Sequence, residues 1–82
     1  EYEGRYHSEE LDTSYRVIYE NGQLVAKHLR GTDIVLTAYG RDRFLESAGG
    51  DLEVEFKRSR RGRITGFEMS VDRARAIAFD RI

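Results

Sequence analysis

A chain of 82 residues is enough for one domain with a small core, and the absence of cysteine excludes disulfides and thiolate metal ligands. Its 14 basic residues are balanced by 15 acidic ones, and the net charge of −1 argues against general nucleic-acid binding, which usually requires a basic excess. No apolar run reaches the length of a membrane span or a signal peptide, so no membrane span is expected. The chain starts at Glu1 and its single methionine is Met69, so we expect residues 1–82 to be one domain cut from a longer chain.

Short runs of β-branched and alternating residues recur along the chain, each closed by a turn signal, which predicts an all-β meander. The expected strands are 3–8, 15–20, 23–30, 34–39, 43–46, 52–56, 63–71 and 74–81. Consecutive antiparallel strands leave two open edges unless the sheet closes on itself. We therefore expect an eight-stranded antiparallel up-and-down barrel, small and largely filled by its own side chains.

The dipeptide Asn21-Gly22 is best suited to a two-residue hairpin turn with positive φ at both positions. This turn predicts three opposed pairs, namely Tyr19 with Leu24, Val17 with Ala26, and Tyr15 with His28. These six side chains then share the inner face. The outer face receives Arg16, Ile18, Val25 and Lys27.

The later turns extend the same inner face. A three-residue loop at 31–33 brings Ile34, Leu36 and Ala38 onto it. The same loop places Leu29 opposite Val35. A four-residue loop at 59–62 predicts Val54 opposite Phe67 and Leu52 opposite Met69. For the last strand, either Ile77 and Phe79 or Ala76 and Ala78 face inward, and side-chain volume favours the first pair.

Several motifs that resemble catalytic or metal sites lack the residues that the chemistry needs. Tyr19-x-Asn21 matches a triplet of penicillin-recognising serine enzymes, but no serine is followed three residues later by lysine. Glu53 and Glu55 alternate with apolar residues and are expected on the solvent face, and the two histidines lack metal-ligand spacing. We therefore expect no enzyme activity and no catalytic, cofactor-binding or metal-binding residue in this chain.

Two groups of residues are candidates for binding a ligand or an acidic partner. Tyr15 and His28 face each other and could line a small cavity, although a polar pair at the barrel rim is the simpler explanation. The 57–63 turn carries Arg58, Arg60, Arg61 and Arg63, which could hold phosphate or an acidic surface. A solvated turn is the simpler explanation here, and the outer face lacks the aromatic residues that stack on single-stranded nucleic acid.

A third candidate is an apolar surface outside the barrel. The predicted register leaves a set of aliphatic side chains on the outer face of the second to fifth strands: Ile18, Val25, Leu29, Val35 and Leu45. A contiguous apolar patch of this kind usually marks an interface. We therefore expect this surface to contact another domain or a second copy of the chain.

The spacing of turn glycines and core aromatics resembles a known family. The motifs are Tyr2-x-Gly4-x-Tyr6, Tyr15-x-Val17, Asn21-Gly22-x-Leu24, Leu36, Asp42-x-Phe44, Val54-x-Phe56-x-Arg58, Gly62-x-Ile64-x-Gly66-Phe67 and Phe79-x-Arg81. Across nearly the whole chain they are similar to the lipocalin-like domain at the C-terminus of serine hydrolases of the β-lactamase and penicillin-binding class. The resemblance implies a barrel that packs on the catalytic domain of its parent chain, shields its active site or aids oligomerisation. It also implies a periplasmic or extracellular location.

The leading hypothesis is therefore a non-catalytic accessory barrel that works through its outer surface. One alternative is a barrel that binds a small hydrophobic ligand near Tyr15 and His28. A weaker alternative is nucleic-acid or anion binding through the basic 57–63 turn.

Overall fold

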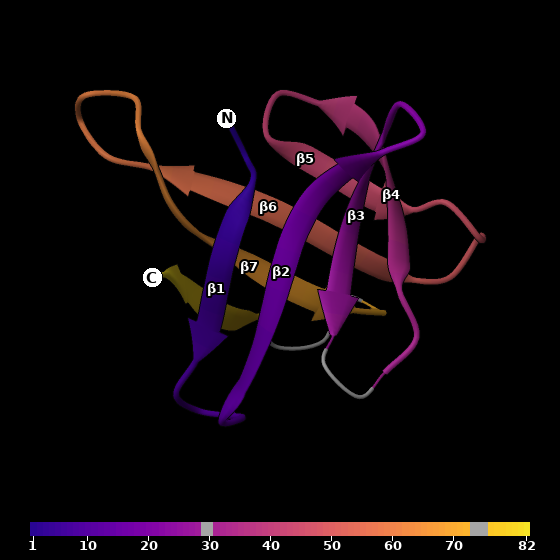
Figure 1. The fold of residues 1–82 in the computed structure, drawn as a ribbon, viewed down its shortest axis with the longest axis horizontal. Coiled ribbons are helices and arrows are strands. Elements are labelled where there is room, and N and C mark those ends of the chain that lie inside the picture. Colours follow the sequence, from indigo (N-terminus) through magenta and orange to yellow (C-terminus); the bar gives the residue numbers. More distant parts are fainter. Residues whose placement is uncertain (29–30, 73–75) are drawn as a thin grey trace.

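The computed structural model describes residues 1–28, 31–72 and 76–82, which form the closed antiparallel barrel that the sequence predicts (Figure 1). Its strands follow one another around the barrel in chain order. They are β1 (Gly4–Ser8), β2 (Thr13–Glu20), β3 (Gln23–His28), β4 (Ile34–Gly40), β5 (Arg43–Glu46), β6 (Leu52–Arg58), β7 (Ile64–Val71) and β8 (Ile77–Arg81). Within the described residues, no helix is long and apolar enough to cross a membrane.

The β2–β3 hairpin has the predicted turn and the predicted register. Asn21 and Gly22 have φ values of 53° and 78°, which are the positive angles that a type I′ turn requires. Tyr19 pairs with Leu24, and the next two predicted pairs follow toward Tyr15 and His28. Tyr19 points inward by this register but is 50% exposed, because it lies at the rim of the barrel.

Between β3 and β4 the predicted facing is confirmed, but the predicted pairing of Leu29 with Val35 is wrong. Val35 pairs with Val25, and Leu36 pairs with Leu24. The connection between paired residues is longer than the predicted three residues. The shift involves an even number of residues, so every side chain keeps its face. Leu29 itself lies outside the described residues.

Between β6 and β7 the predicted partners are also wrong by two positions. Val54 pairs with Met69, and Phe56 pairs with Phe67. Lys57 pairs with Gly66 and Arg58 pairs with Ile64, so Thr65 is an extra residue on β7, and the connection at 59–63 is one residue longer than predicted. Such a bulge cannot be recognised from hydrophobic alternation alone, because the large residues still face inward.

The interior is filled by side chains, as expected. Phe67 and Phe79 stack with ring centroids 4.7 Å apart, and Tyr6 lies 4.9 Å from Phe67. Ile77 packs against this core, so the larger pair of β8 residues faces inward. The core cluster consists of Tyr6, Val17, Leu24, Ala26, Leu36, Phe44, Val54, Phe56, Ile64, Phe67, Met69 and Phe79.

The barrel closes where β1 meets β8. Tyr6 pairs with Arg81, His7 pairs with Asp80, and the Ile82 amide donates to the Arg5 carbonyl at 2.9 Å. The Arg81 guanidinium donates to the carbonyl oxygens of Glu3 and Ile64, which lie on opposite sides of β8. One side chain therefore links the first strand to the seventh.

Candidate functional site

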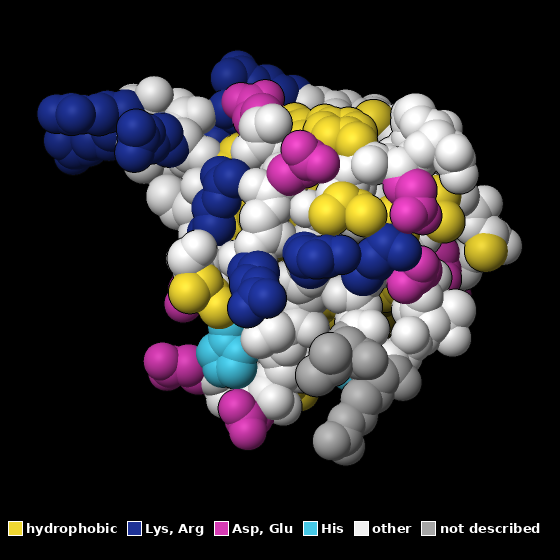
Figure 2. Space-filling model, in the orientation of Figure 1, with side chains coloured by type: hydrophobic (Ala, Val, Ile, Leu, Met, Phe, Trp, Pro, Cys, Tyr) yellow, Lys and Arg dark blue, Asp and Glu magenta, His cyan; other side chains and the backbone are white. Residues whose placement is uncertain are grey.

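The β6–β7 connection projects beyond the body of the barrel and carries a concentration of basic side chains (Figures 1 and 2). We call residues 59–63 the arginine loop. Its three arginines, Arg60, Arg61 and Arg63, are all exposed. The molecule is close to neutral as a whole, so this positive charge is a local feature of one loop.

The backbone of the arginine loop is held by its own hydrogen bonds. The Ser59 amide donates to the Arg63 carbonyl at 2.8 Å, and the Gly62 amide donates to the Ser59 carbonyl at 2.9 Å. The Ser59 hydroxyl oxygen accepts from the amides of Arg61 and Arg63, both at 3.3 Å. Gly62 has a φ of 82°, which glycine adopts without strain. The loop is thus an ordered turn, and its arginine side chains point toward the solvent.

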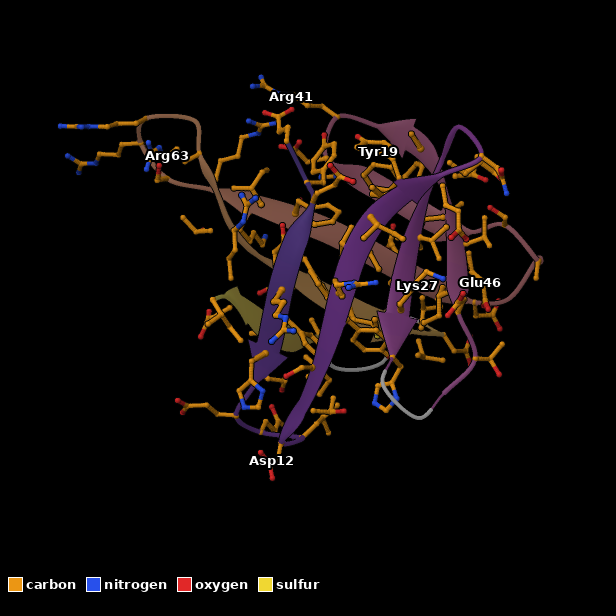
Figure 3. The ribbon with its side chains drawn as sticks, in the orientation of Figure 1. Asp12, Tyr19, Lys27, Arg41, Glu46 and Arg63 are labelled. Carbon is orange, nitrogen blue, oxygen red and sulfur yellow. The ribbon has the colours of Figure 1, made fainter. Side chains whose placement is uncertain are left out.

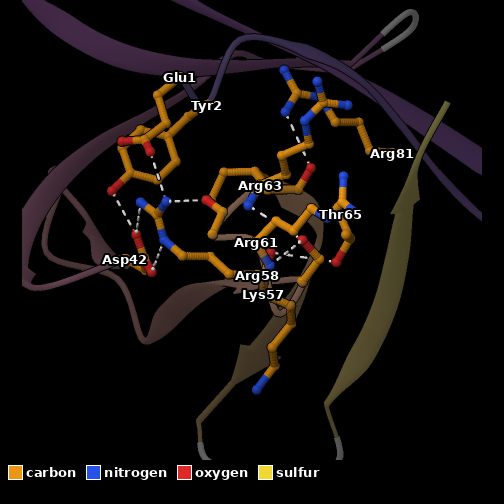
Figure 4. Close-up of polar contacts among 12 residues, drawn as sticks. Glu1, Tyr2, Asp42, Lys57, Arg58, Arg61, Arg63, Thr65 and Arg81 are labelled. Atoms are coloured by element: carbon orange, nitrogen blue, oxygen red, sulfur yellow. Dashed lines mark hydrogen bonds and ion pairs between the residues drawn. The ribbon is translucent and has the colours of Figure 1, made fainter.

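Arg58 differs from the three loop arginines because its charge is used inside the molecule (Figure 4). Its Nε and Nη2 atoms donate to the two carboxylate oxygens of Asp42 at 2.7 and 2.9 Å. Its Nη1 atom donates to Glu1 Oε2 and to the Gly62 carbonyl, both at 2.6 Å. The Arg58 side chain is 18% exposed and that of Asp42 is 12% exposed. Arg58 therefore anchors the base of the arginine loop to the β4–β5 turn.

The electrostatics of this cluster keep both partners charged. The Arg58 guanidinium lowers the pKa of Asp42 below its ordinary value, and the hydroxyl of Tyr2, which donates to Asp42 Oδ1 at 2.7 Å, lowers it further. The carboxylates of Asp42 and Glu1 in turn raise the pKa of Arg58. A planar guanidinium that meets a carboxylate through two parallel hydrogen bonds is a strong and directional contact.

The apolar side chains on the outer face are less exposed than the sequence suggests. Ile18, Val25 and Val35 are opposed across β2, β3 and β4 and form a strip. Val25 faces outward and does not belong to the core cluster, yet it is only 3% exposed because its neighbours cover it. Ile18 and Val35 are half-buried, whereas Leu45 is 42% exposed and pairs with Thr37 on the next strand.

Tyr15 and His28 are brought together as their predicted pairing requires. Their ring centroids are 5.2 Å apart, and the Tyr15 ring also packs on Phe79 of the core. Thr13 Oγ1 lies 2.6 Å from His28 Nε2, and burial raises the pKa of Tyr15. Both residues border a hollow of about 610 Å³, which opens on the barrel surface rather than inside it.

Sequence reasoning did not identify a row of basic side chains on the outer face of β1, β2 and β3. Arg5 pairs with Arg16, and Arg16 pairs with Lys27. The three cationic residues therefore form a line across three neighbouring strands. We call these three residues the basic row. Lys27 Nζ binds Asp33 at 2.9 Å and Glu20 at 3.5 Å, and the hydrogen bond that it donates to Asp33 raises the pKa of Lys27. The opposition of Arg16 and Lys27 follows from the Asn21-Gly22 turn, but Arg5 joins the row only through the β1–β2 register.

The described part of the chain contains no group of three or more His, Cys, Asp or Glu residues that could hold a metal ion. It also contains no buried side-chain nitrogen or oxygen without a hydrogen-bond partner. Glu55 lies on the outer face, within 3.5 Å of Arg43 and 3.4 Å of Lys57, so it is engaged in ion pairs.

No protein-family model matches the sequence, and no curated protein matches it either.

Proposed function

We propose that this barrel is a non-catalytic accessory domain that binds the catalytic domain of its own parent chain, a β-lactamase-like serine hydrolase. The observation that carries the proposal is the arginine loop. It presents Arg60, Arg61 and Arg63 to solvent on a backbone that is already fixed by hydrogen bonds. The partner surface is acidic, and the outer face of the barrel supplies the apolar part of the contact.

Preorganisation is the physical reason why this loop suits binding. A loop that is already ordered loses little conformational entropy when it meets its partner. Arg58 contributes to this order because it ties the Gly62 carbonyl to Asp42. Arginine also binds carboxylates in a bidentate manner, and opposite charges on two surfaces speed their encounter.

The filled interior supports a role for the outer surface. Aromatic residues from β1, β6, β7 and β8 occupy the centre of the barrel. A ligand inside the barrel would have to displace this packing. The resemblance of the turn glycines and core aromatics to the lipocalin-like domain of serine hydrolases supports the identity of the partner.

The test begins with the natural gene. The residues encoded before Glu1 are expected to include a domain with a Ser-x-x-Lys motif, and a gene without any hydrolase domain overturns the proposal. The catalytic domain is then produced separately and titrated with the barrel by calorimetry. We expect saturable binding that weakens at least about tenfold in the double variant Arg60→Glu/Arg61→Glu.

The matched control is Arg41→Glu, an exposed arginine in the neighbouring β4–β5 turn. It is expected to bind with nearly unchanged affinity. An equal loss in the control would show that only overall charge matters. The same variants are applied to heparin in a salt gradient. Salt-dependent retention that is lost in the double variant, without binding to the catalytic domain, would identify a nucleic-acid module instead.

A further inference from the structure

The basic row is an arrangement that the barrel does not need for its own stability. Side chains directly opposite each other in an antiparallel pair have Cβ atoms about 5 Å apart, and like charges at this distance repel. Arg16 has a cationic neighbour on each side, Arg5 on β1 and Lys27 on β3. Figure 2 shows basic side chains that cross this face of the barrel.

The three residues of the basic row differ in how their charges are balanced. Lys27 is paired with Asp33 and Glu20, so its charge is compensated. Within residues 1–28, 31–72 and 76–82, the side chains of Arg5 and Arg16 form no ion pair or hydrogen bond. Two exposed arginines therefore occupy paired positions on neighbouring strands, with all their guanidinium donors available.

A hollow lies at the basic row. Its volume of about 610 Å³ is in the range of small-molecule sites. It is lined by residues of both charges, by hydroxyl and ring-bearing residues and by one exposed aliphatic residue: Arg5, Ser14, Tyr15, Arg16, Lys27, His28, Asp33 and Ile82. Positive charge and a concave surface thus coincide at one place.

We propose that this hollow binds a small organic anion whose phosphate or carboxylate group is held by Arg5 and Arg16. Each guanidinium can donate two parallel hydrogen bonds to such a group, and the bound negative charge removes the repulsion between the two arginines. Asp33 keeps Lys27 in place at one edge of the hollow and limits the net positive charge there. This site uses other residues than the arginine loop, so it does not depend on the function proposed above.

The test is a titration of the intact barrel, followed by amide NMR spectra, with four probes. Phenyl phosphate and benzoate carry the two possible anionic groups, inorganic phosphate lacks an organic part, and benzyl alcohol lacks the charge. We expect saturable shifts of the amides of Arg5, Arg16 and Lys27 with at least one organic anion. The anion that binds more tightly identifies the group that the site prefers.

Variants then distinguish binding of the anion at this site from general electrostatic attraction to the barrel. Arg5→Gln and Arg16→Gln are each expected to weaken binding of the preferred probe about tenfold or more, because each removes a charged hydrogen-bond donor. Arg41→Gln, an exposed arginine of the β4–β5 turn, is the matched control and is expected to leave affinity unchanged. Equal weakening in Arg41→Gln, equal binding of benzyl alcohol, or no saturable shift with either organic anion would overturn the proposal.

A second readout does not depend on the choice of probe. Arg16→Glu places a carboxylate between Arg5 and Lys27, so we expect the ligand-free barrel to melt at a higher temperature than wild type in low salt. The same variant is expected to lose anion binding. A lower melting temperature that does not depend on salt would show that Arg16 has a structural role and would contradict the proposal.

Discussion

At the scale of single residues, Arg58 shows how a charged side chain can serve the fold and a surface loop together. The sequence places it in a basic run, next to three arginines that the structure leaves exposed. Its partners Asp42 and Glu1 are 16 and 57 positions away in the chain. No local pattern predicts such contacts, so the sequence does not distinguish Arg58 from its neighbours.

The Asp42–Arg58 pair predicts how stability changes with pH. The pKa of Asp42 is lower in the folded state than its ordinary value, because Arg58 and then Tyr2 stabilise the carboxylate. The stabilisation is therefore present above about pH 4, the ordinary aspartate value, and is lost as pH falls through the lower folded value. Asp42→Asn is expected to melt a few degrees below wild type at pH 7, and thermal melts from pH 7 to pH 2 should show this difference shrinking in acid.

Asp80→Asn is the control for this experiment, because Asp80 is exposed on β8. We expect it to melt like wild type over the whole pH range. A difference between Asp42→Asn and wild type that persists at pH 2 would mean that the amide disturbs the turn itself, rather than removing a charge interaction.

At the scale of elements, the parity of the strands could be predicted, whereas the exact register could not. The Asn21-Gly22 turn determines which side chains of β2 and β3 face inward. The partners of Val35 and Val54 differ from the predicted ones by four and two positions, and an even difference leaves these side chains on their predicted faces. The longer β3–β4 connection changes partners without changing faces, whereas the irregularity near Lys57 interrupts the alternation on β7, where Ile64 and Phe67 both belong to the core. Hydrophobic alternation carries no information about such shifts.

The packing of β7 on β8 depends on one glycine. A Cβ atom on Gly66 would overlap the carbonyl oxygen of Phe79, whose backbone cannot move without disturbing the core. Gly66→Ala is expected to lower the free energy of unfolding by about 1–3 kcal/mol, as overpacking usually does, and urea unfolding measures it. Gly40→Ala is the matched control, since its nearest side-chain atoms would be 3.9 Å away. Equal losses in both variants would show that the overlap with the Phe79 carbonyl is not the cause of the loss in Gly66→Ala.

At the scale of the whole molecule, closure and the filled core could be predicted from eight short strands with large alternating residues. The candidate sites were predictable only in part. Tyr15 and His28 follow from one turn, and the exposed arginines follow from composition. The basic row requires three strands in register, and the burial of Val25 depends on the neighbours that cover it. Surface features that depend on several strands at once are therefore the hardest to predict from the sequence.

The arginine loop lies at the opposite end of the barrel from the β1–β2 turn. Figure 3 shows Arg41 and Arg63 toward one end and Asp12 at the opposite end. Successive turns of an up-and-down barrel alternate between the ends, which places the first and the sixth turn at opposite ends. In the proposed accessory function, the acidic partner binds at the end that carries the arginine loop.

Closure of the barrel depends on the contact between β1 and β8, where two pairs of the described residues are in register. Arg81 reinforces this contact, because its guanidinium bonds to carbonyl oxygens of Glu3 and Ile64 and its Cζ lies 5.8 Å from the centroid of the Tyr6 ring. Arg81→Met keeps much of the side-chain volume but removes the donors. We expect the amides of β1 and β8 to exchange hydrogen faster in this variant, while those of the β2–β3 hairpin keep their protection.

The reason for this pattern is that a barrel can open at one contact without losing its other strand pairs. Opening between β1 and β8 leaves the β6–β7 and β2–β3 pairings intact, and these are the longest in register. Arg41→Met provides the control, since Arg41 is exposed and lies in the turn between β4 and β5. Uniformly faster exchange over all strands in Arg81→Met would show instead that the barrel unfolds as a single unit and has no weak contact at which it opens first.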